Sequence, residues 1–363
     1  MSDRHEVTRV ALVGCGAVSA LYYGPALREL VTAGELRLSH VFDPDRVAAE
    51  RIASCFRGSE VADSFEAVCR SEADLVIVAS PPTLHASQTI ELLDAGRSVL
   101  CEKPLATSVA DAERMVAAAV RRDRLLAAGM VRRFLPAAQV IREIVASRLL
   151  GDLRSLEWAE GSATFGWPVS SRRYFSRSYA GGGVLMDIGV HVLDLLTWWF
   201  GEPAEIKYRD DVMGGVEANA LVSVRFPGGM TGSIRLSRDT QLANCLLIRG
   251  GHGWLRWSES LGEKLEIGIE GSRYVLDATL RRCSRGRTAV RVPAYNFEQC
   301  FVAQLRNVLA AVRGEDRLFV SAETALGSIA LVERCYGSRT LMRMGWLEAS
   351  EEGRAQHLQR GSS

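Results

Sequence analysis

Three ionisable residues have the types and the spacing needed to move a proton. Asp187 and His191 lie four residues apart in an apolar stretch that predicts a helix, so their side chains share one face of it. Lys103 follows an apolar run and precedes Pro104, which indicates the end of a buried strand. A lysine there points into the crevice where parallel sheets bind ligands. If the three meet, they can exchange a proton with a hydroxyl and stabilise charge on its oxygen.

Two other interpretations use the same residues. The spacing of Asp187 and His191 also suits metal ligation, but no third ligand is assigned to them, and we predict no metal site. Asp194 continues roughly the same helix face, and a hydrogen-bonded core pair would also satisfy buried charges. Lys103 and the glycine-rich turn described next favour the catalytic interpretation.

A glycine-rich turn, GCGAVS, follows the first apolar run and opens a helix. Gly14 permits a tight turn, Gly16 lets a pyrophosphate approach the backbone, and Ser19 takes the place of the usual third glycine. The start of the helix adds free N–H donors for an anion. The pattern predicts a dinucleotide cofactor held by Gly14, Gly16, Ala17 and Val18.

Asp43 ends the second predicted strand. A carboxylate at this position accepts hydrogen bonds from the adenosine ribose hydroxyls and repels a 2′-phosphate, so we expect NAD rather than NADP. Asp43 is also placed to cap a helix that begins at Pro44, and both roles are compatible. The nearby Arg46 leaves the use of NADP open.

Two further turns are expected beside the cofactor. The segment SPPTLH follows a strand, and its prolines stiffen the turn, so Ser80, Pro81 and His85 are assigned to cofactor binding. A rigid turn capped by Thr83, with a structural histidine, is the alternative. Glu102 and Lys103 end the next strand and complete the predicted cofactor contacts.

The elements that must position these residues change in character along the chain. Short apolar runs alternate with helical patterns in the first third, which predicts βαβ units and a parallel sheet. The strands are expected at 9–14, 36–43, 74–80, 98–101 and 125–131. Later, residues 217–237 alternate with period two, as in an antiparallel sheet. Helices are expected at 136–150, 184–200, 298–313 and 322–336.

This change of pattern divides the chain. We predict a dinucleotide-binding domain over residues 1–130, a substrate-binding and oligomerisation domain over 131–348, and a disordered polar tail over 349–363. The outward face of the 217–237 strands includes Leu221, so we expect sheets to pack across a two-fold axis in a homodimer or homotetramer.

Composition excludes several classes of protein. The 363 residues carry 44 basic and 43 acidic side chains, so the chain is not a nucleic-acid binder that relies on bulk charge. The longest apolar stretch contains Asp187, His191 and Asp194, which argues against a membrane span. The eight cysteines form no C-x-x-C pair, and we expect reduced thiols and a cytoplasmic location.

The motifs GCGAVS, ASPPTLH, CEKP, MVRRF and GGGVLMDIGVHVLD together resemble the family of glucose-fructose oxidoreductase, inositol dehydrogenase and MocA. The resemblance spans almost the whole chain. It implies an α/β fold, with an N-terminal Rossmann domain and a C-terminal α+β domain that carries a large, mostly antiparallel open sheet. It also implies an NAD(P)-dependent oxidoreductase that acts on CH–OH groups.

The same resemblance implies roles for the site residues. Lys103, Asp187 and His191 would lie beside the nicotinamide, where a hydride moves to or from a secondary carbinol carbon of a sugar or cyclitol, among them nucleotide-linked and amino sugars of specialised metabolism. His191 would be the general acid/base, Lys103 would bind the same oxygen, and Asp187 would hold a second hydroxyl or orient the group. A non-catalytic NAD-binding sensor of the same fold is the alternative.

Substrate contacts are expected from aromatic and basic residues that precede a second glycine-rich turn, Gly181–Gly183, or follow the fifth strand. Aromatic rings stack on sugar C–H faces, and arginines bind hydroxyls or phosphates. The candidates are Arg133, Trp167, Arg172, Tyr174 and Tyr179. A solvated loop with ordinary surface arginines would explain the segment before the turn equally well.

Overall fold

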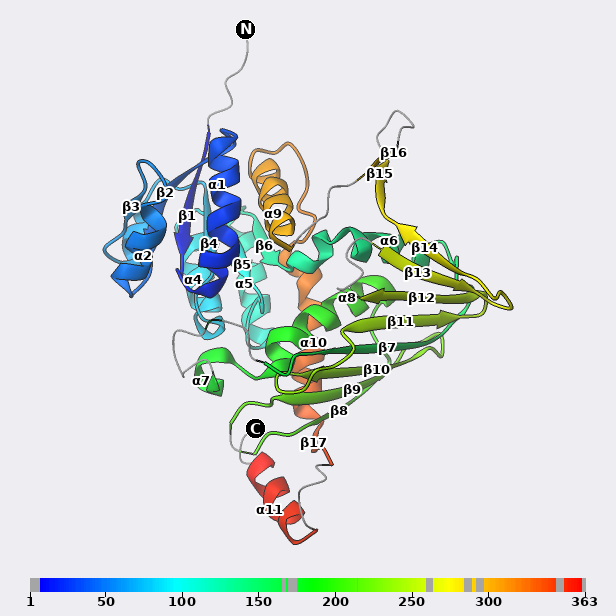
Figure 1. Cartoon of the computed structure of the whole chain (residues 1–363). Helices are drawn as coiled ribbons and strands as arrows, with labels where there is room; N and C mark the ends of the chain where they lie inside the picture. The colour runs from blue at the N-terminus through cyan, green and yellow to red at the C-terminus, as the bar shows by residue number, and fades with distance from the viewer. Residues whose placement is uncertain are drawn as a thin grey trace.

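The computed structural model describes residues 7–164, 168, 175–213, 215–258, 264–283, 289–291, 297–343 and 349–360. Its N-terminal part is a six-stranded parallel sheet with helices on both faces (Figure 1). The strands are β1 (Thr8–Val13), β2 (Leu36–Phe42), β3 (Glu60–Val61), β4 (Leu75–Val78), β5 (Ser98–Glu102) and β6 (Leu126–Gly129). The helices are α1 (Gly24–Thr32), α2 (Arg46–Ala53), α3 (Phe65–Arg70), α4 (Pro82–Asp94) and α5 (Val109–Arg122).

The order of this sheet, β3-β2-β1-β4-β5-β6, explains where a ligand can bind. The strand order reverses between β1 and β4, and a crevice opens outside the carboxyl ends of the strands at such a point. All four residues of β4 are buried, as expected for a parallel strand covered by helices on both faces. The predicted Rossmann domain is confirmed.

The C-terminal part is built on a nine-stranded sheet with the order β14-β13-β12-β11-β7-β10-β9-β8-β17. Its strands are β7 (Leu153–Gly161), β8 (Glu205–Asp210), β9 (Asn219–Arg225), β10 (Thr231–Ser237), β11 (Cys245–Gly250), β12 (Gly253–Ser258), β13 (Lys264–Ile269), β14 (Val275–Thr279) and β17 (Arg339–Leu341). A separate hairpin joins β15 (Arg281–Cys283) and β16 (Ala289–Arg291). Only the β10–β7 and β17–β8 pairs are parallel, so the predicted open, mostly antiparallel sheet is confirmed.

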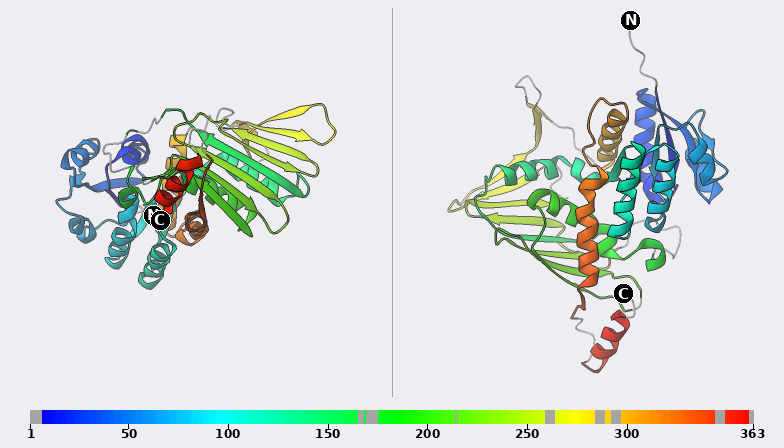
Figure 2. Two further views of the ribbon diagram at one scale, coloured as in Figure 1. Left: turned by 90° about the horizontal axis from the view of Figure 1, so that it is seen from below. Right: turned by 180° about the vertical axis from the view of Figure 1, so that it is seen from behind.

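Helices cover one face of the large sheet (Figure 2). They are α6 (Pro136–Ala146), α8 (Val190–Phe200) and α10 (Ala322–Gly337), and a short α7 (Arg177–Ala180) precedes α8. The alternation predicted for 217–237 holds, because Val222, Ile234 and Leu236 are buried beneath these helices. A π-helical turn, Leu185–Gly189, leads directly into α8 and carries Asp187.

The C-terminal helix α9 (Phe297–Val312) returns to the N-terminal domain and lies beside α1 (Figure 1). The ring of Phe301 stacks on Tyr22 with centroids 4.9 Å apart, and Arg306 pairs with Glu29 and Glu35. The chain thus changes pattern at residue 130, whereas in space α9 packs with the N-terminal domain.

The expected disordered tail at 349–363 needs a correction, because the structure has a helix there, α11 (Ala349–Arg360). Ala355 and Gln359 lie four residues apart and are both buried. The Gln359 amide donates a hydrogen bond of 2.9 Å to the Asp210 carboxylate at the end of β8. One small residue and one amide thus give a polar segment a face that packs on the protein.

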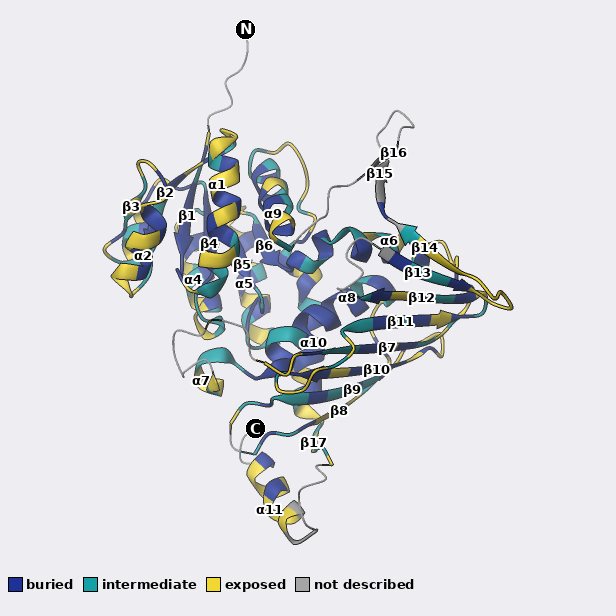
Figure 3. Cartoon of the chain, viewed as in Figure 1, coloured by how far each residue is buried: buried dark blue, intermediate teal, exposed yellow. Residues whose placement is uncertain are grey.

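Within the described residues, Arg177–Phe200 is the one helical stretch long and apolar enough to cross a membrane. However, 78% of its most apolar window is buried inside the protein. Figure 3 shows α8 coloured mostly as buried, and it packs against α6 and α10. This stretch is therefore a core helix, which explains how it accommodates Asp187, His191 and Asp194.

Candidate active site

Asp187 and Lys103 meet, although 84 residues separate them in the sequence. Lys103 follows β5, and its Nζ lies 2.7 Å from Asp187 Oδ1 and 3.0 Å from the Asp187 carbonyl oxygen. Arg238, which follows β10, reaches the other carboxylate oxygen at 2.5 Å. One carboxylate therefore lies between two cations, at the junction of both domains.

The two cations control the ionisation of Asp187. Partial burial opposes the charged form, but the neighbouring Lys103 ammonium and Arg238 guanidinium outweigh it. They hold the pKa of the Asp187 carboxyl well below its usual range. Asp187 is thus an anion at neutral pH, and it fixes the position of the Lys103 ammonium.

His191 lies one turn along the same helix and is 7% exposed. Burial lowers its pKa well below the ordinary value, and the charges of Lys103 and Arg132 lower it further, while Asp187 opposes them. The imidazole is therefore neutral at neutral pH and can accept a proton. Its buried Nδ1 has no hydrogen-bond partner among the described residues.

The sequence analysis missed Arg238. A signal was present, because Ile234, Leu236 and Arg238 continue one period-two face of β10 and its extension, and the first two are core residues. A charged residue in that register must find a buried partner. Its partner, Asp187, is 51 residues away in the sequence, so periodicity could not identify it.

The glycine-rich turn has the backbone that its motif requires. Gly14 has φ +93°, and a Cβ on it would lie 2.5 Å from the Ala79 backbone. A Cβ on Gly16 would meet no atom within 4 Å, so the space beside it is open to a ligand. Ser19 is buried, and its hydroxyl donates to the Gly14 carbonyl at 2.6 Å, which explains why serine suits this position.

Asp43 lies directly beside this turn. Its carboxylate accepts the Cys15 N–H at 2.7 Å and the Asp45 N–H at 2.8 Å, and each oxygen keeps a further lone pair for a ribose hydroxyl. The cap of α2 is Asp45, not Asp43, since Asp45 accepts from the first turn of that helix. The Arg46 guanidinium is bound to Glu50 and Asp63 at 3.0 and 3.1 Å.

His85 and Glu102 are both buried behind the Lys103 turn. The two ring nitrogens of His85 face the carbonyl oxygens of Pro104 and Ser80 at 2.7 and 2.8 Å, which ties two predicted cofactor loops together. Burial lowers the pKa of His85 and raises that of Glu102. Glu102 accepts from the Tyr23 hydroxyl at 2.7 Å and from the Lys103 N–H at 3.0 Å. Both side chains support the crevice from the protein side.

The residues predicted to bind substrate have different outcomes in the structure. Arg133 is 2% exposed, and its guanidinium binds Asp194 at 2.6 and 2.8 Å and the Thr324 carbonyl at 2.8 Å, so it joins helices in the interior. Tyr179 lies on α7, where its carbonyl oxygen accepts from Thr83 at 3.3 Å. Trp167, Arg172 and Tyr174 lie outside the described residues.

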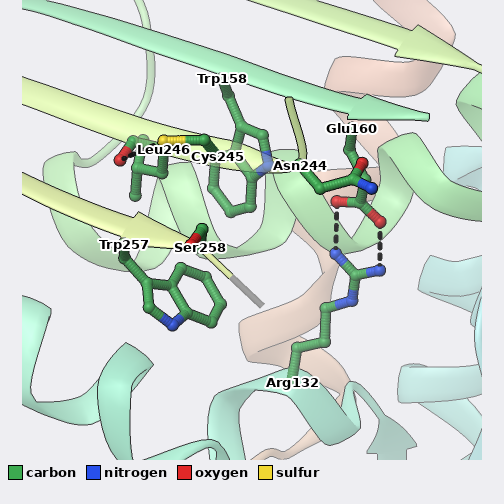
Figure 4. A pocket seen from close by; sticks show the side chains of 8 residues that line it. All are labelled: Arg132, Trp158, Glu160, Asn244, Cys245, Leu246, Trp257 and Ser258. Atoms are coloured by element: carbon green, nitrogen blue, oxygen red, sulfur yellow. Dashed lines mark hydrogen bonds and ion pairs between the residues drawn. The ribbon is translucent and has the colours of Figure 1, made fainter. Parts of the chain in front are cut away.

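A small pocket lies where the strands of the large sheet face the segment after β6 (Figure 4). Arg132 and Glu160 form a two-bonded ion pair there, with distances of 2.8 and 2.6 Å. Trp158 and Trp257 stand beside it, with ring centroids 6.2 Å apart. The charge of Arg132 is also among those that, after burial, lower the pKa of His191.

Comparison with known proteins places this architecture in a family. Residues 8–130 match the sequence model described as an oxidoreductase family with an NAD-binding Rossmann fold. Residues 138–256 match the C-terminal domain of the same GFO/IDH/MocA group. The chain belongs to the GFO/IDH/MocA oxidoreductase family. Its N-terminal domain is accordingly an NAD-binding domain.

Two curated relatives are dehydrogenases. The chain is 29% identical to trans-1,2-dihydrobenzene-1,2-diol dehydrogenase of Bos taurus over 57% of its own length and 62% of the relative's. It is 32% identical to D-glucoside 3-dehydrogenase of Escherichia coli over 54% and 55% of the two lengths. The chain thus spans somewhat more than half the length of these relatives.

Solved structures share the fold over nearly the whole chain. Levoglucosan dehydrogenase in complex with NADH and levoglucosan has a TM-score of 0.80 at 18% identity, covering 92% of this chain and 97% of that one. A 3-ketoreductase from Actinomadura kijaniata in complex with NADP and TDP-benzene has a TM-score of 0.77 at 21% identity, covering 93% of this chain and 100% of that one. At these identities the likeness establishes the fold.

Proposed function

We propose that this protein is an NAD-dependent dehydrogenase or ketoreductase that acts on a secondary hydroxyl of a sugar or cyclitol. The observation that carries the proposal is the junction of Lys103, Asp187 and His191 beside the carboxyl ends of a Rossmann sheet. A lysine fixed by a carboxylate and a neutral histidine are the groups that deprotonation of an alcohol requires.

The residues around the first turn fit a dinucleotide. The positive φ of Gly14 and the open space at Gly16 would let a pyrophosphate approach the backbone, and the free N–H groups at the start of the following helix would suit its charge. Asp43 would accept the ribose hydroxyls, and it favours NAD because a 2′-phosphate would meet its negative charge. When bound, the nicotinamide supplies a hydride acceptor for oxidation or a hydride donor for reduction.

The chain's own residues then handle the proton and the developing charge. Neutral His191 accepts the hydroxyl proton during oxidation, and the resulting imidazolium returns it during reduction. The Lys103 ammonium stabilises the negative charge that grows on the same oxygen. Asp187 and Arg238 hold that ammonium in place.

The similar proteins guide the choice of substrates. Some are named for a dihydrobenzenediol, a glucoside or levoglucosan, which are uncharged. Others share the fold and were crystallised with UDP-GlcNAcA or TDP-benzene, which carry phosphate groups. Neutral sugars, cyclitols and nucleotide-linked sugars, amino sugars among them, are therefore compared in the assay below.

The proposal includes assembly through the large sheet. The face turned away from the helices carries half-buried apolar residues among charged ones, namely Leu221, Leu247 and Trp254. A second copy would cover this face across a two-fold axis.

The test is the absorbance of NADH during incubation with NAD and a panel of sugars, cyclitols and nucleotide-linked sugars. Turnover is expected with at least one sugar, cyclitol or nucleotide-linked sugar of the panel. Lys103→Met and His191→Gln should each lower kcat by about 10²- to 10⁴-fold while NAD affinity stays nearly the same. Exposed Lys207 on β8 offers the matched control Lys207→Met, which should keep full activity. NAD binding without turnover on the whole panel would instead favour the sensor alternative.

A further inference from the structure

We propose that Glu217 is a positioning residue for Asp187. It binds the turn Gly181–Gly183, which leads into the helical segment that carries Asp187 and His191. This inference rests on the proposed function for its activity readout. Glu217 precedes β9 and is 1% exposed. It belongs to a buried polar cluster that the chemistry described above does not use.

One oxygen of the Glu217 carboxylate accepts hydrogen bonds from backbone N–H groups at the start of the helix. Its Oε1 accepts the Gly183 N–H at 3.0 Å and the Leu185 N–H at 3.1 Å. The Tyr336 hydroxyl donates to the same oxygen at 2.8 Å. The Glu217 carbonyl oxygen also accepts the Val184 N–H at 2.9 Å. The N–H groups of Gly183, Val184 and Leu185, which have no acceptor within the helix, therefore all donate to Glu217.

A short chain of hydrogen bonds links this residue to the site. The Gly183 N–H is held by Glu217, and the Gly183 carbonyl oxygen accepts the Asp187 N–H at 3.1 Å. Asp187 in turn receives the Lys103 ammonium on both its carbonyl and its carboxylate oxygens. A shift of the turn would move the carboxylate that fixes the lysine.

The glycines of the turn are explained by the same contact. A Cβ on Gly183 would lie 2.0 Å from the Glu217 carbonyl oxygen, and a Cβ on Gly182 would lie 2.0 Å from the Tyr336 hydroxyl. No other residue lets the backbone approach so closely. Gly182 and Gly183 are thus glycines because Tyr336 and Glu217 occupy the space that their side chains would need.

Glutamate suits this position because the groups hydrogen-bonded to its side chain, the N–H groups of Gly183 and Leu185 and the Tyr336 hydroxyl, are donors. Arg339 lies 3.6 Å from Glu217 Oε2, and its guanidinium also contacts Asp210 at 2.7 Å and lies over the Tyr336 ring. A carboxylate only accepts, so it matches this surrounding at both oxygens. A glutamine keeps one acceptor for the turn but turns an amide N–H₂ toward the arginine.

The experiment compares Glu217→Ala, Glu217→Asp and Glu217→Gln with Asp210→Asn as the matched control. Asp210 is equally buried and shares Arg339, but it does not contact the turn. Thermal unfolding, NAD affinity, kcat and KM are measured for each variant. Glu217→Ala should lower kcat by about 10- to 100-fold with little change in NAD affinity, as a displaced group does. Glu217→Gln should recover most of kcat, whereas Asp210→Asn should lose stability and keep kcat.

Glu217→Asp covers the case in which the alanine variant does not fold. It keeps the carboxylate but shortens its reach by one C–C bond, so it should fold and still lose kcat. NMR titration of His191 tests the site without turnover. The titration midpoint of His191 should shift in the alanine and aspartate variants but not in Asp210→Asn. Unchanged kcat and an unchanged titration in a folded Glu217 variant would overturn the inference. Equal loss of kcat in Asp210→Asn would also overturn it. An inactive wild type with these titration shifts would refute only the proposed function.

Discussion

Burial lowers the pKa of His191 most and the charge of Lys103 lowers it further, so removing that charge tests the electrostatics of the site. The Lys103 ammonium lies 3.0 Å from the Asp187 carbonyl oxygen, and His191 follows one helical turn later. At an effective dielectric constant of about 20, two unit charges one helical turn apart (roughly 5 Å) interact by about 3 kcal/mol. Lys103→Met should therefore raise the pKa of His191.

Arg238 keeps Asp187 ionised in this variant, so the carboxylate also favours the imidazolium. The sign of the pH dependence follows. In the wild type the folded pKa of His191 lies below its unfolded value, so its contribution to stability is complete above about pH 6.5 and is lost as the pH falls. Raising the folded pKa in Lys103→Met should weaken this loss of stability at acid pH.

The assay is an NMR titration of the imidazole nitrogens. The chain has six histidines, and His191→Gln identifies the resonance of interest. The wild-type His191 should stay neutral well below pH 6.5, whereas in Lys103→Met it should titrate closer to that value. Lys207→Met, which removes an exposed lysine, should leave the titration unchanged. A wild-type His191 that titrates near 6.5, or no change in Lys103→Met, would refute this account of the site.

Two further predictions concern the cofactor and the assembly. Asp43→Ala should weaken NAD binding by about 1–3 kcal/mol and narrow the preference for NAD over NADP, because the ribose loses a charged acceptor. Fluorescence titration measures both affinities, and tighter binding of NADP than of NAD by the wild type would contradict the assignment. Light scattering at micromolar concentration should give a dimer or tetramer, and Leu221→Glu on the outer face of β9 should dissociate it. A monomeric wild type would show that this face of the sheet is not an interface.

Local sequence patterns determined much of this protein. Alternating apolar runs and helical segments predicted the parallel sheet, and period-two alternation predicted β9 and β10, because burial on one or both faces of a strand leaves a regular trace. The positions of Gly14 and Lys103 could also be predicted, since each follows an apolar run that marks a strand. Asp187 and His191 were placed on one face by helical spacing alone.

Only the tertiary structure decided which buried charges pair. Arg133 was expected at the substrate, yet it binds Asp194, and Arg238 was missed although it holds Asp187. The polar tail was expected to be disordered, yet Gln359 anchors α11 on Asp210. A sequence shows that a charged or polar residue in a buried register needs a partner, but not which distant residue supplies it. That choice depends on how the two domains and the returning C-terminal helices pack, which no local period encodes.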